Sequence, residues 1–283
     1  MRVETRLAEA DLRQESGNDP DPAPEPRASH APALTLIART PPPGAPLKAD
    51  RNRPFILRLG KNLRGVFDRL IASSSLVSNA PVLDVRDFAW TALLRADWQA
   101  IRDEAVAVTR THTEIDTAID TQTDSRRSFF LWGYSFPIDD NIARCPRTAA
   151  IVAQIPGLNS AFFSILAPGT HIPEHRGVTK GLITCHLGLI VPRDGDVRMR
   201  VADRVMRWSE GETLVFDDTY DHEVWNDTSG TRVVLLIQVR RPLRNPGRWI
   251  ADIFLNVIRR SPFVQDARAN LISWNAAMEA FDS

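Results

Sequence analysis

Three polar residues in the second half of the sequence have the types and the order that an iron-dependent oxidation requires. His175 lies in the segment PGTHIPEHRG, and His222 follows 47 residues later in DDTYDHEVWND. Arg232 comes ten residues after His222, directly before the apolar run VVLLIQV. Imidazole suits Fe(II), and non-haem oxygenases keep metal positions open for a cosubstrate and O₂. Because a guanidinium can bind a carboxylate bidentately, this set predicts an Fe(II) site coupled to a 2-oxoglutarate pocket.

One expected metal ligand is missing. Many such sites have a carboxylate two residues after the first histidine, and this sequence has Gly177 there. His175 and His222 are then the only protein ligands that the sequence offers. The gap keeps a chloride-binding halogenase open as a second reaction class. A cupin-like binding protein without turnover is a third class, which the intact histidines and arginine disfavour.

Two further residues are candidates for the 2-oxoglutarate pocket. His186 lies inside the apolar segment LITCHLGLIV and, by strand alternation, shares a face with Thr184 and Gly188. Ser164 offers a hydroxyl on the segment before the first histidine. Taken alone, His186 is equally well explained as a core histidine with a hydrogen-bond partner, and Arg232 as a charge in solvent at a strand end. A buried Arg232 would instead need an anion beside it.

Short apolar segments separated by turn sequences dominate the chain from about residue 129. They predict strands at 160–167, 182–191, 196–202, 213–218 and 231–239. Helical spacing of apolar residues predicts helices at 55–71, at 87–108 with Asp87 as N-cap, and at 246–260, with a polar loop at 109–128. The expected fold is mainly β with flanking helices around a double-stranded β-helix, that is, a jelly-roll or cupin-like core.

The composition bounds the domain organisation and the partners. Ten of the 20 prolines fall before residue 55, which predicts a disordered segment 1–54 and one catalytic domain at 55–283. Lys plus Arg and Asp plus Glu both number 35, so no net field favours nucleic acid as a partner. Two cysteines build no disulfide framework, and no apolar run is long enough to cross a bilayer.

These features predict a cytoplasmic protein. The basic amphipathic segments 55–71 and 246–260 leave a second interpretation open, in which the protein lies on the inner face of the membrane. The other explanation of both segments is that their apolar faces pack on the barrel.

Several motifs occur in an order that resembles a known family. HLGL at 186–189, FDD at 216–218, HEVWND at 222–227 and TRVVL at 231–235 look like the aspartyl/asparaginyl β-hydroxylase family of Fe(II)/2-oxoglutarate oxygenases. The resemblance covers roughly residues 129–242. It implies that His175 and His222 bind iron, with a water in place of the missing carboxylate. It also implies that Arg232, His186 and Ser164 bind 2-oxoglutarate, with O₂ as cosubstrate and ascorbate in support. The expected reaction hydroxylates an unactivated C–H bond and releases succinate and CO₂.

The chain departs from that family where the substrate would bind. Members that hydroxylate Asp or Asn carry arginines at two positions that are Leu182 and Thr184 here. Lys180 is expected to compensate for them only in part, as a point charge without fork geometry. The family also includes bacterial hydroxylases of lipid acyl chains, and SLVSNAPVLD (75–84) and RRPL (240–243) look closer to that branch. The sequence therefore leaves a small molecule, a peptide or a lipid open as substrate and disfavours an aspartyl peptide.

Overall fold

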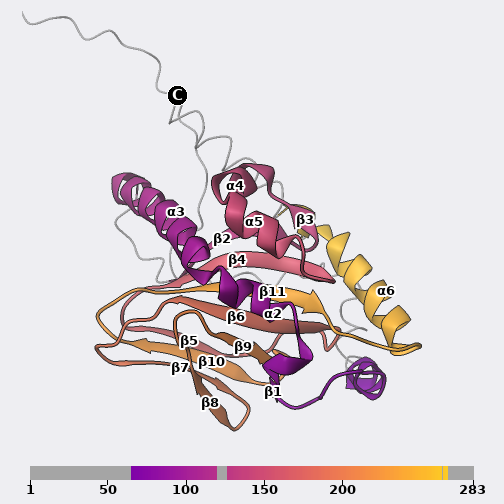
Figure 1. Ribbon diagram of the computed structural model, residues 1–283. Helices are drawn as coiled ribbons and strands as arrows, with labels where there is room; N and C mark the ends of the chain where they lie inside the picture. The colour runs from indigo at the N-terminus through magenta and orange to yellow at the C-terminus, as the bar shows by residue number, and fades with distance from the viewer. Residues whose placement is uncertain (1–64, 120–125, 263, 267–283) are drawn as a thin grey trace, which may run out of the picture. The chain divides into compact units, whose positions relative to one another are not determined.

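Two antiparallel sheets lie face to face, and helices cover the outer face of the larger sheet (Figure 1). The computed structural model describes residues 65–119, 126–262 and 264–266, which all belong to one compact unit, residues 53–283. The predicted disordered segment 1–54 lies outside the described residues. The prediction of a mainly β fold with a jelly-roll core is confirmed.

The larger sheet has the strand order β1-β9-β6-β11-β4-β2-β3. All of its pairings are antiparallel. Its strands are β1 (Val82–Leu83), β2 (Arg126–Gly133), β3 (Phe136–Pro137), β4 (Leu158–Leu166), β6 (Leu182–Ile190), β9 (Thr213–Phe216) and β11 (Arg232–Arg240). Three of the five predicted strands correspond to its centre, β6, β11 and β4, and a fourth to β9.

The smaller sheet has the order β5-β10-β7-β8. Its strands are β5 (Thr170–His175), β7 (Asp196–Val201), β8 (Arg204–Arg207) and β10 (His222–Asp227). Only β7 is predicted from the sequence. The other three are short and rich in charged residues, and cross-strand pairing stabilises them more than an apolar pattern does.

The central strands of the larger sheet separate two cores, because successive side chains point to opposite faces. On β6, Cys185 and Leu187 pack in the core beneath the helices. On β11, Val234 instead packs between the two sheets. That second core also takes side chains from β7 and β10, such as Met199 and Val224. The space between the sheets is therefore where β6 and β11 present their polar residues.

The predicted helix 87–108 is wrong in its boundaries. The chain forms a 3₁₀ turn (Val85–Asp87), then α2 (Thr91–Ala96) and α3 (Trp98–Ile119). Asp84, not Asp87, caps the 3₁₀ turn by accepting from the Arg86 N–H. Asp97 leaves helical geometry between α2 and α3, and its carboxylate pairs with Arg147 at 2.6 Å. The helix is therefore interrupted at Asp97, where the side chain forms a tertiary ion pair. The spacing of the apolar residues gives no sign of this interruption.

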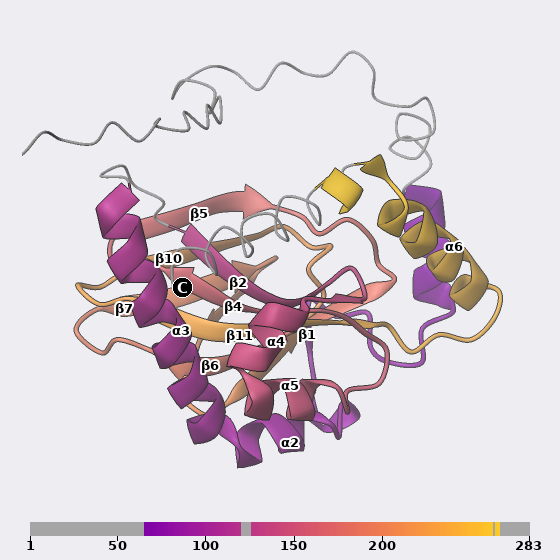
Figure 2. The ribbon, with the colours of Figure 1, turned by 90° about the horizontal axis from the view of Figure 1, so that it is seen from above.

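The predicted loop 109–128 is also wrong in part, because α3 continues to Ile119 and β2 already begins at Arg126. The first half of α3 packs on β6 and α5, and a helix that is already nucleated gains one hydrogen bond for each residue added. Two short helices, α4 (Asp139–Arg144) and α5 (Pro146–Val152), lie beside α3 over the same sheet (Figure 2).

Two helices flank one end of the barrel. Residues 65–73 are helical, which confirms the described part of the predicted helix 55–71, and residues 55–64 lie outside the described residues. The predicted helix 246–260 is present as α6 (Gly247–Arg259). Within the described residues, no helix has the length and the apolar character that crossing a bilayer requires.

Candidate active site

His175 and His222 face each other across two neighbouring strands. His175 ends β5 and His222 begins β10, and the two residues are direct partners in the antiparallel register. Their ring centroids are 4.1 Å apart. His222 is buried and His175 is exposed, so the pair lies where the space between the sheets opens to solvent.

Each histidine is oriented through its Nδ1. The His175 Nδ1 lies 2.8 Å from the Pro173 carbonyl oxygen, and the His222 Nδ1 lies 3.0 Å from the Tyr220 carbonyl oxygen. Because a carbonyl only accepts, each Nδ1 must carry the hydrogen, which leaves a lone pair on each Nε2. Burial lowers the pKa of His222 and so favours its neutral form. Metal-binding histidines are held in this way, and the pair could bind one metal ion.

The space beside Gly177 is filled by Asp218. A Cβ atom at position 177 would overlap the Asp218 carboxyl group, and the Gly177 N–H donates to the Asp218 carbonyl oxygen at 2.6 Å. Burial raises the pKa of Asp218 to about 6, while the neighbouring His175 acts in the opposite direction. The Asp218 Oδ1 has no hydrogen-bond partner among the described residues. A carboxylate therefore lies beside the histidine pair although Gly177 carries none.

Asp218 is held in this place by two polar side chains. Its Oδ2 accepts from the Thr184 hydroxyl at 3.0 Å and from the Gln238 amide at 3.1 Å. Thr184 is one of the two positions at which family members that act on Asp or Asn are expected to carry arginine. Here its hydroxyl is occupied with Asp218, and Leu182 is buried. Neither side chain supplies a cation for a substrate carboxylate.

Lys180 does not supply such a cation either. Its Nζ lies 2.7 Å from the Asp217 Oδ2, and Arg241 pairs with the same carboxylate. The Asp217 and Arg241 side chains are fully buried and Lys180 is 11% exposed, so the three charges form a closed triad. The suggestion that Lys180 compensates for the missing arginines is therefore disfavoured by its contacts.

Arg232 lies between the sheets, and no carboxylate of the described residues is paired with it. It is 2% exposed, and its Nη1 donates a long 3.4 Å hydrogen bond to the Ser164 carbonyl oxygen. Its Nε has no partner among the described residues. Burial lowers the pKa of Arg232 to about 9, with a smaller contribution from Arg126. An inserted anion would relieve a cation in such a position.

His186 also presents an unused hydrogen-bonding group. Its Nδ1 accepts from the Trp208 indole N–H at 3.3 Å, and burial lowers its pKa well below the ordinary value. A neutral imidazole with an accepting Nδ1 carries its hydrogen on Nε2. That Nε2 is buried and has no partner among the described residues. It is a donor that lacks an acceptor.

The structure brings all five predicted site residues to the space between the sheets. Arg232 lies over the Trp208 ring at 5.0 Å, and Trp208 stacks on His186 at 5.9 Å. Ser164 is paired with Val234 on the neighbouring strand, on the same face as Arg232. From His186 the contacts continue through the Phe216 ring, 5.0 Å away, to His222. Two unsatisfied donors thus lie deep in the site, and the histidine pair lies at its opening.

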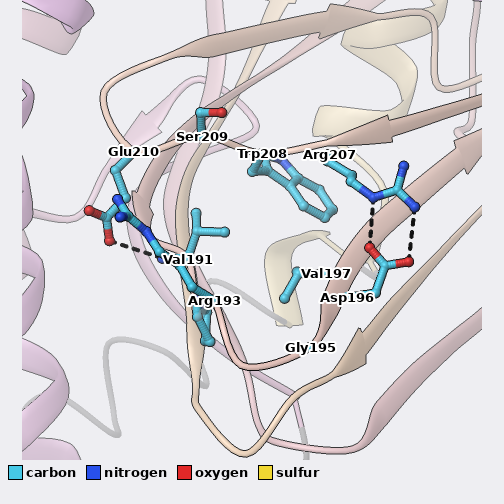
Figure 3. A pocket seen from close by; sticks show the side chains of 10 residues that line it. Val191, Arg193, Gly195, Asp196, Val197, Arg207, Trp208, Ser209 and Glu210 are labelled. Atoms are coloured by element: carbon cyan, nitrogen blue, oxygen red, sulfur yellow. Dashed lines mark hydrogen bonds and ion pairs between the residues drawn. The ribbon is translucent and has the colours of Figure 1, made fainter.

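A separate pocket of about 360 Å³ lies at the opposite end of the smaller sheet (Figure 3). Asp196 lines this pocket and forms an ion pair with Arg207. In the strand register Asp196 lies opposite Asp227, which is at the other end of β10 from His222. Trp208 also lines this pocket and is the closest link to the site, through its contacts with His186 and Arg232. None of the five predicted site residues lines this pocket.

The donor set fits a two-histidine metal site and a carboxylate-bearing cosubstrate. Among the described residues, no group of three or more His, Cys, Asp or Glu side chains could hold a metal ion. The Arg232 Nε and the His186 Nε2, which have no partner among the described residues, could donate hydrogen bonds to a carboxylate of a buried dicarboxylate. Sequence reasoning missed Asp218, Gln238 and Trp208. Asp218 had a signal, since it lies four residues before His222 in the FDD motif, whereas Gln238 and Trp208 had none.

Comparison with known proteins identifies the family of this two-sheet fold. The model of the aspartyl/asparaginyl β-hydroxylase family matches residues 95–242. The chain is 37% identical over 274 residues to an ornithine lipid ester-linked acyl 2-hydroxylase of Rhizobium tropici, covering 92% of this chain and 95% of that protein. The chain therefore belongs to the aspartyl/asparaginyl β-hydroxylase family, as its motifs predict.

Two other similarities are more limited. The human aspartyl/asparaginyl β-hydroxylase is 30% identical over 161 residues, which cover 54% of this chain and 21% of the human protein. Among solved structures, a cupin domain of a transcriptional regulator from Enterobacter cloacae matches with a TM-score of 0.29 and 17% identity, covering 42% of this chain and 99% of that domain.

Proposed function

We propose that this protein is an Fe(II)- and 2-oxoglutarate-dependent hydroxylase of a lipid acyl chain. The observation that carries the chemistry is the combination of two opposed histidines with two buried nitrogens, the Arg232 Nε and the His186 Nε2, that have no partner among the described residues. The lipid substrate is supported by the similarity to the Rhizobium tropici ornithine lipid hydroxylase along nearly the whole chain. The absence of a free cation at Leu182 and Thr184 agrees with a substrate that is less acidic than an aspartyl peptide.

Each residue would have a separate task. His175 and His222 would hold the iron through Nε2, and Asp218, whose Oδ1 has no partner among the described residues, would place a hydrogen-bond acceptor beside them. Arg232 would bind the distal carboxylate of 2-oxoglutarate, and the His186 Nε2–H would donate to the same group. Ser164 would line that pocket. Bound Fe(II) would supply the oxidative chemistry in which 2-oxoglutarate and O₂ yield succinate, CO₂ and a hydroxylated C–H position.

The structure also bears on the two alternatives. A halogenase would place chloride beside Gly177, and the Asp218 carboxylate already fills that space. Two anionic groups so close together repel one another, which disfavours chloride binding. A ligand-binding protein without turnover would bind iron and 2-oxoglutarate and release no succinate.

The test is a reconstituted assay with matched variants. The purified protein would be incubated with Fe(II), ascorbate, 2-oxoglutarate and mixed micelles of ornithine lipid, while succinate and lipid mass are followed. We expect one oxygen atom to be added to the lipid for each succinate formed. His175→Ala and His222→Ala should lose iron binding and turnover. His171→Ala is the control, because His171 lies on the same strand but stacks on Trp225 on the outer face of the sheet.

The outcomes separate the hypotheses. Succinate formation with hydroxylation of an aspartyl peptide instead of the lipid would refute the substrate assignment. Full iron occupancy in both histidine variants would refute the metal site. Binding of iron and 2-oxoglutarate with no succinate from any substrate would favour the binding protein.

A further inference from the structure

Exposed apolar side chains gather on one part of the surface. Ten large apolar side chains of the described residues are exposed, and eight of them lie on helix 65–73, its exit, the loop after His175, and α6. We call these eight the apolar patch: Val66, Phe67, Leu70, Leu76, Val178, Trp249, Ile253 and Val257. Leu93 and Val205, the other two, lie on α2 and β8. Scattered exposed apolar residues need no explanation, whereas a cluster marks an interaction surface.

The helix α6 is apolar over more of its surface than its packing uses. Gly247, Ala251 and Leu255 are four residues apart and buried against the rest of the protein. Trp249, Ile253 and Val257 have the same spacing, lie on another face, and are 63%, 64% and 46% exposed. The exposed stripe is therefore additional to the stripe that packing on the barrel requires. The explanation that this segment only covers the barrel accounts for the first stripe and not for the second.

Helix 65–73 lies beside the beginning of α6 (Figures 1 and 2). The Gly247 N–H donates to the Ser74 hydroxyl at 3.2 Å, and a Cβ atom at Gly247 would overlap the Ser74 side chain. The exposed residues Val66, Phe67 and Leu70 of this helix add to the α6 stripe. The two helices thus present a joint apolar surface.

The apolar patch lies at the end of the barrel where the candidate site opens. A Cβ atom on Gly181 would be 2.9 Å from the Ala251 Cβ, so α6 packs directly on the loop that follows His175. The Asp68 carboxylate accepts from the Lys180 N–H at 3.1 Å and ties helix 65–73 to the same loop. Val178 on this loop is 51% exposed and only three residues after His175. A substrate that approaches across the patch would therefore reach the histidine pair.

The charge beside the patch is positive. Residues 240–260 contain six arginines and one acidic residue, Asp252. Asp252 pairs with Arg240 and Arg248, and Arg241 is committed to the buried triad with Asp217. Arg244 and Arg260 are exposed, and no carboxylate is paired with them in the described residues. An apolar stripe with an exposed tryptophan and flanking arginines is typical of a helix that lies in the interface of an anionic membrane.

We propose that the apolar patch docks on the surface of an anionic bilayer and holds the opening of the site at the depth of the lipid ester. The patch would remove the apolar side chains of α6 and of helix 65–73 from water. The link to acyl-chain delivery rests on the proposed function, and the membrane contact stands on the patch alone. The occupant favoured by the charge and by the tryptophan is a lipid surface and not a second copy of the chain.

Vesicle co-sedimentation of the full chain tests this proposal. Vesicles of phosphatidylcholine with about 30% phosphatidylglycerol would be compared with vesicles of phosphatidylcholine alone. Binding to the anionic vesicles should be stronger and should weaken as added salt shortens the Debye length from ~10 Å at 0.1 M to ~3 Å at 1 M. Trp249→Glu with Ile253→Glu should lower the partition coefficient by about tenfold or more, because it places charge in the apolar stripe.

A matched control gives the result its meaning. Val205→Glu introduces the same charge at a residue that is 53% exposed on β8, away from the patch, and should bind like the wild type. Circular dichroism melting would show that all variants fold, and hydroxylation of a short-chain substrate below its critical micelle concentration should be unchanged by Trp249→Glu with Ile253→Glu. Absence of vesicle binding by the wild type, or equal loss in Val205→Glu, would overturn the proposal. Concentration-dependent dimerisation abolished by the α6 variant would overturn it in favour of a second copy.

The same experiment keeps the two proposals apart. Vesicle binding that depends on Trp249 and Ile253, with no hydroxylation of any lipid, would support the docking surface and refute the proposed function. Lipid hydroxylation with no vesicle binding would support the proposed function and refute the docking surface.

Discussion

The buried triad of Asp217, Lys180 and Arg241 permits a sharp prediction about stability. Asp217→Asn keeps the shape of the side chain and removes its charge, so two cations lose their common partner. Asp217 and Arg241 are fully buried and Lys180 nearly so. Breaking a buried ion pair from one side costs ~3–5 kcal/mol, because the remaining charge stays out of water. For a domain of this size, that is a fall in Tm of about 6–20 °C, at ~2–4 °C per kcal/mol.

The chain contains a control with the same connectivity. Asp196 also bridges two cations, Arg198 and Arg207, but it lies on the surface with its side chain 36% exposed. Exposed ion pairs contribute little to stability, so Asp196→Asn should lower the Tm much less than Asp217→Asn does. High salt should reduce the effect of Asp196→Asn and leave that of Asp217→Asn almost unchanged, since buried pairs are screened less.

The assay is thermal and urea unfolding of both variants at low and high salt. Asp217 also accepts from the Thr219 backbone N–H at 3.1 Å and the Thr219 hydroxyl at 2.5 Å, which an asparagine oxygen can still do. The expected loss therefore arises at Oδ2, where the asparagine would no longer present a charged acceptor to Lys180 and Arg241. If Asp217→Asn destabilises the protein by no more than Asp196→Asn, the reasoning from burial is wrong.

Three further predictions concern the site itself. Gly177→Ala should weaken iron binding, measured by metal titration, because its Cβ would displace the Asp218 carboxyl group, whereas Gly133→Ala, with 3.9 Å to the nearest atom, should not. Arg232→Met should abolish the rise in Tm that 2-oxoglutarate causes and should leave the ligand-free protein equally or more stable, since it removes an unpaired buried cation; a retained ligand effect would exclude Arg232 from the pocket. The pKa of His186 is depressed in the folded state, so its contribution to stability is present above the unfolded pKa of ~6.5 and is lost as the pH falls below it. Urea unfolding at pH 7.5 and 5.5 should accordingly show a smaller decrease for His186→Gln, and an equal decrease would contradict the burial argument.

The sequence predicts the strands with an apolar run, such as β6 and β11, or with regular alternation, such as β7, and misses those that rely on their neighbours. β6 and β11 carry continuous apolar runs, which are typical of strands in the centre of a sheet. β5 and β10 are short and hold charges on their outer face, so only their pairing with each other and with β7 defines them. The sequence therefore predicts His175 and His222 as metal ligands. It does not predict the strands, β5 and β10, that bring the two side chains together.

The two adjacent aspartates show a second limit of the sequence. Asp217 and Asp218 are chemically identical and consecutive, yet one closes the triad with Lys180 and Arg241, and the other lies against Gly177. Which of them turns toward the histidines depends on the direction in which the chain leaves β9. Local propensity does not encode that direction.

The position of β5 has a consequence for the exchange of backbone amide hydrogens. Among the described strands β5 lies at the edge of its sheet and pairs with β10, and its last residue is His175. An ion bound by both His175 and His222 would cross-link this edge strand to β10, the next strand of the sheet. Local opening of β5 would then require release of the ion, so the protection of its amides would report metal occupancy without any turnover. Without the ion, a β5 strand that opens would also expose unpaired backbone groups to a second chain. Metal loss would therefore favour aggregation through this strand.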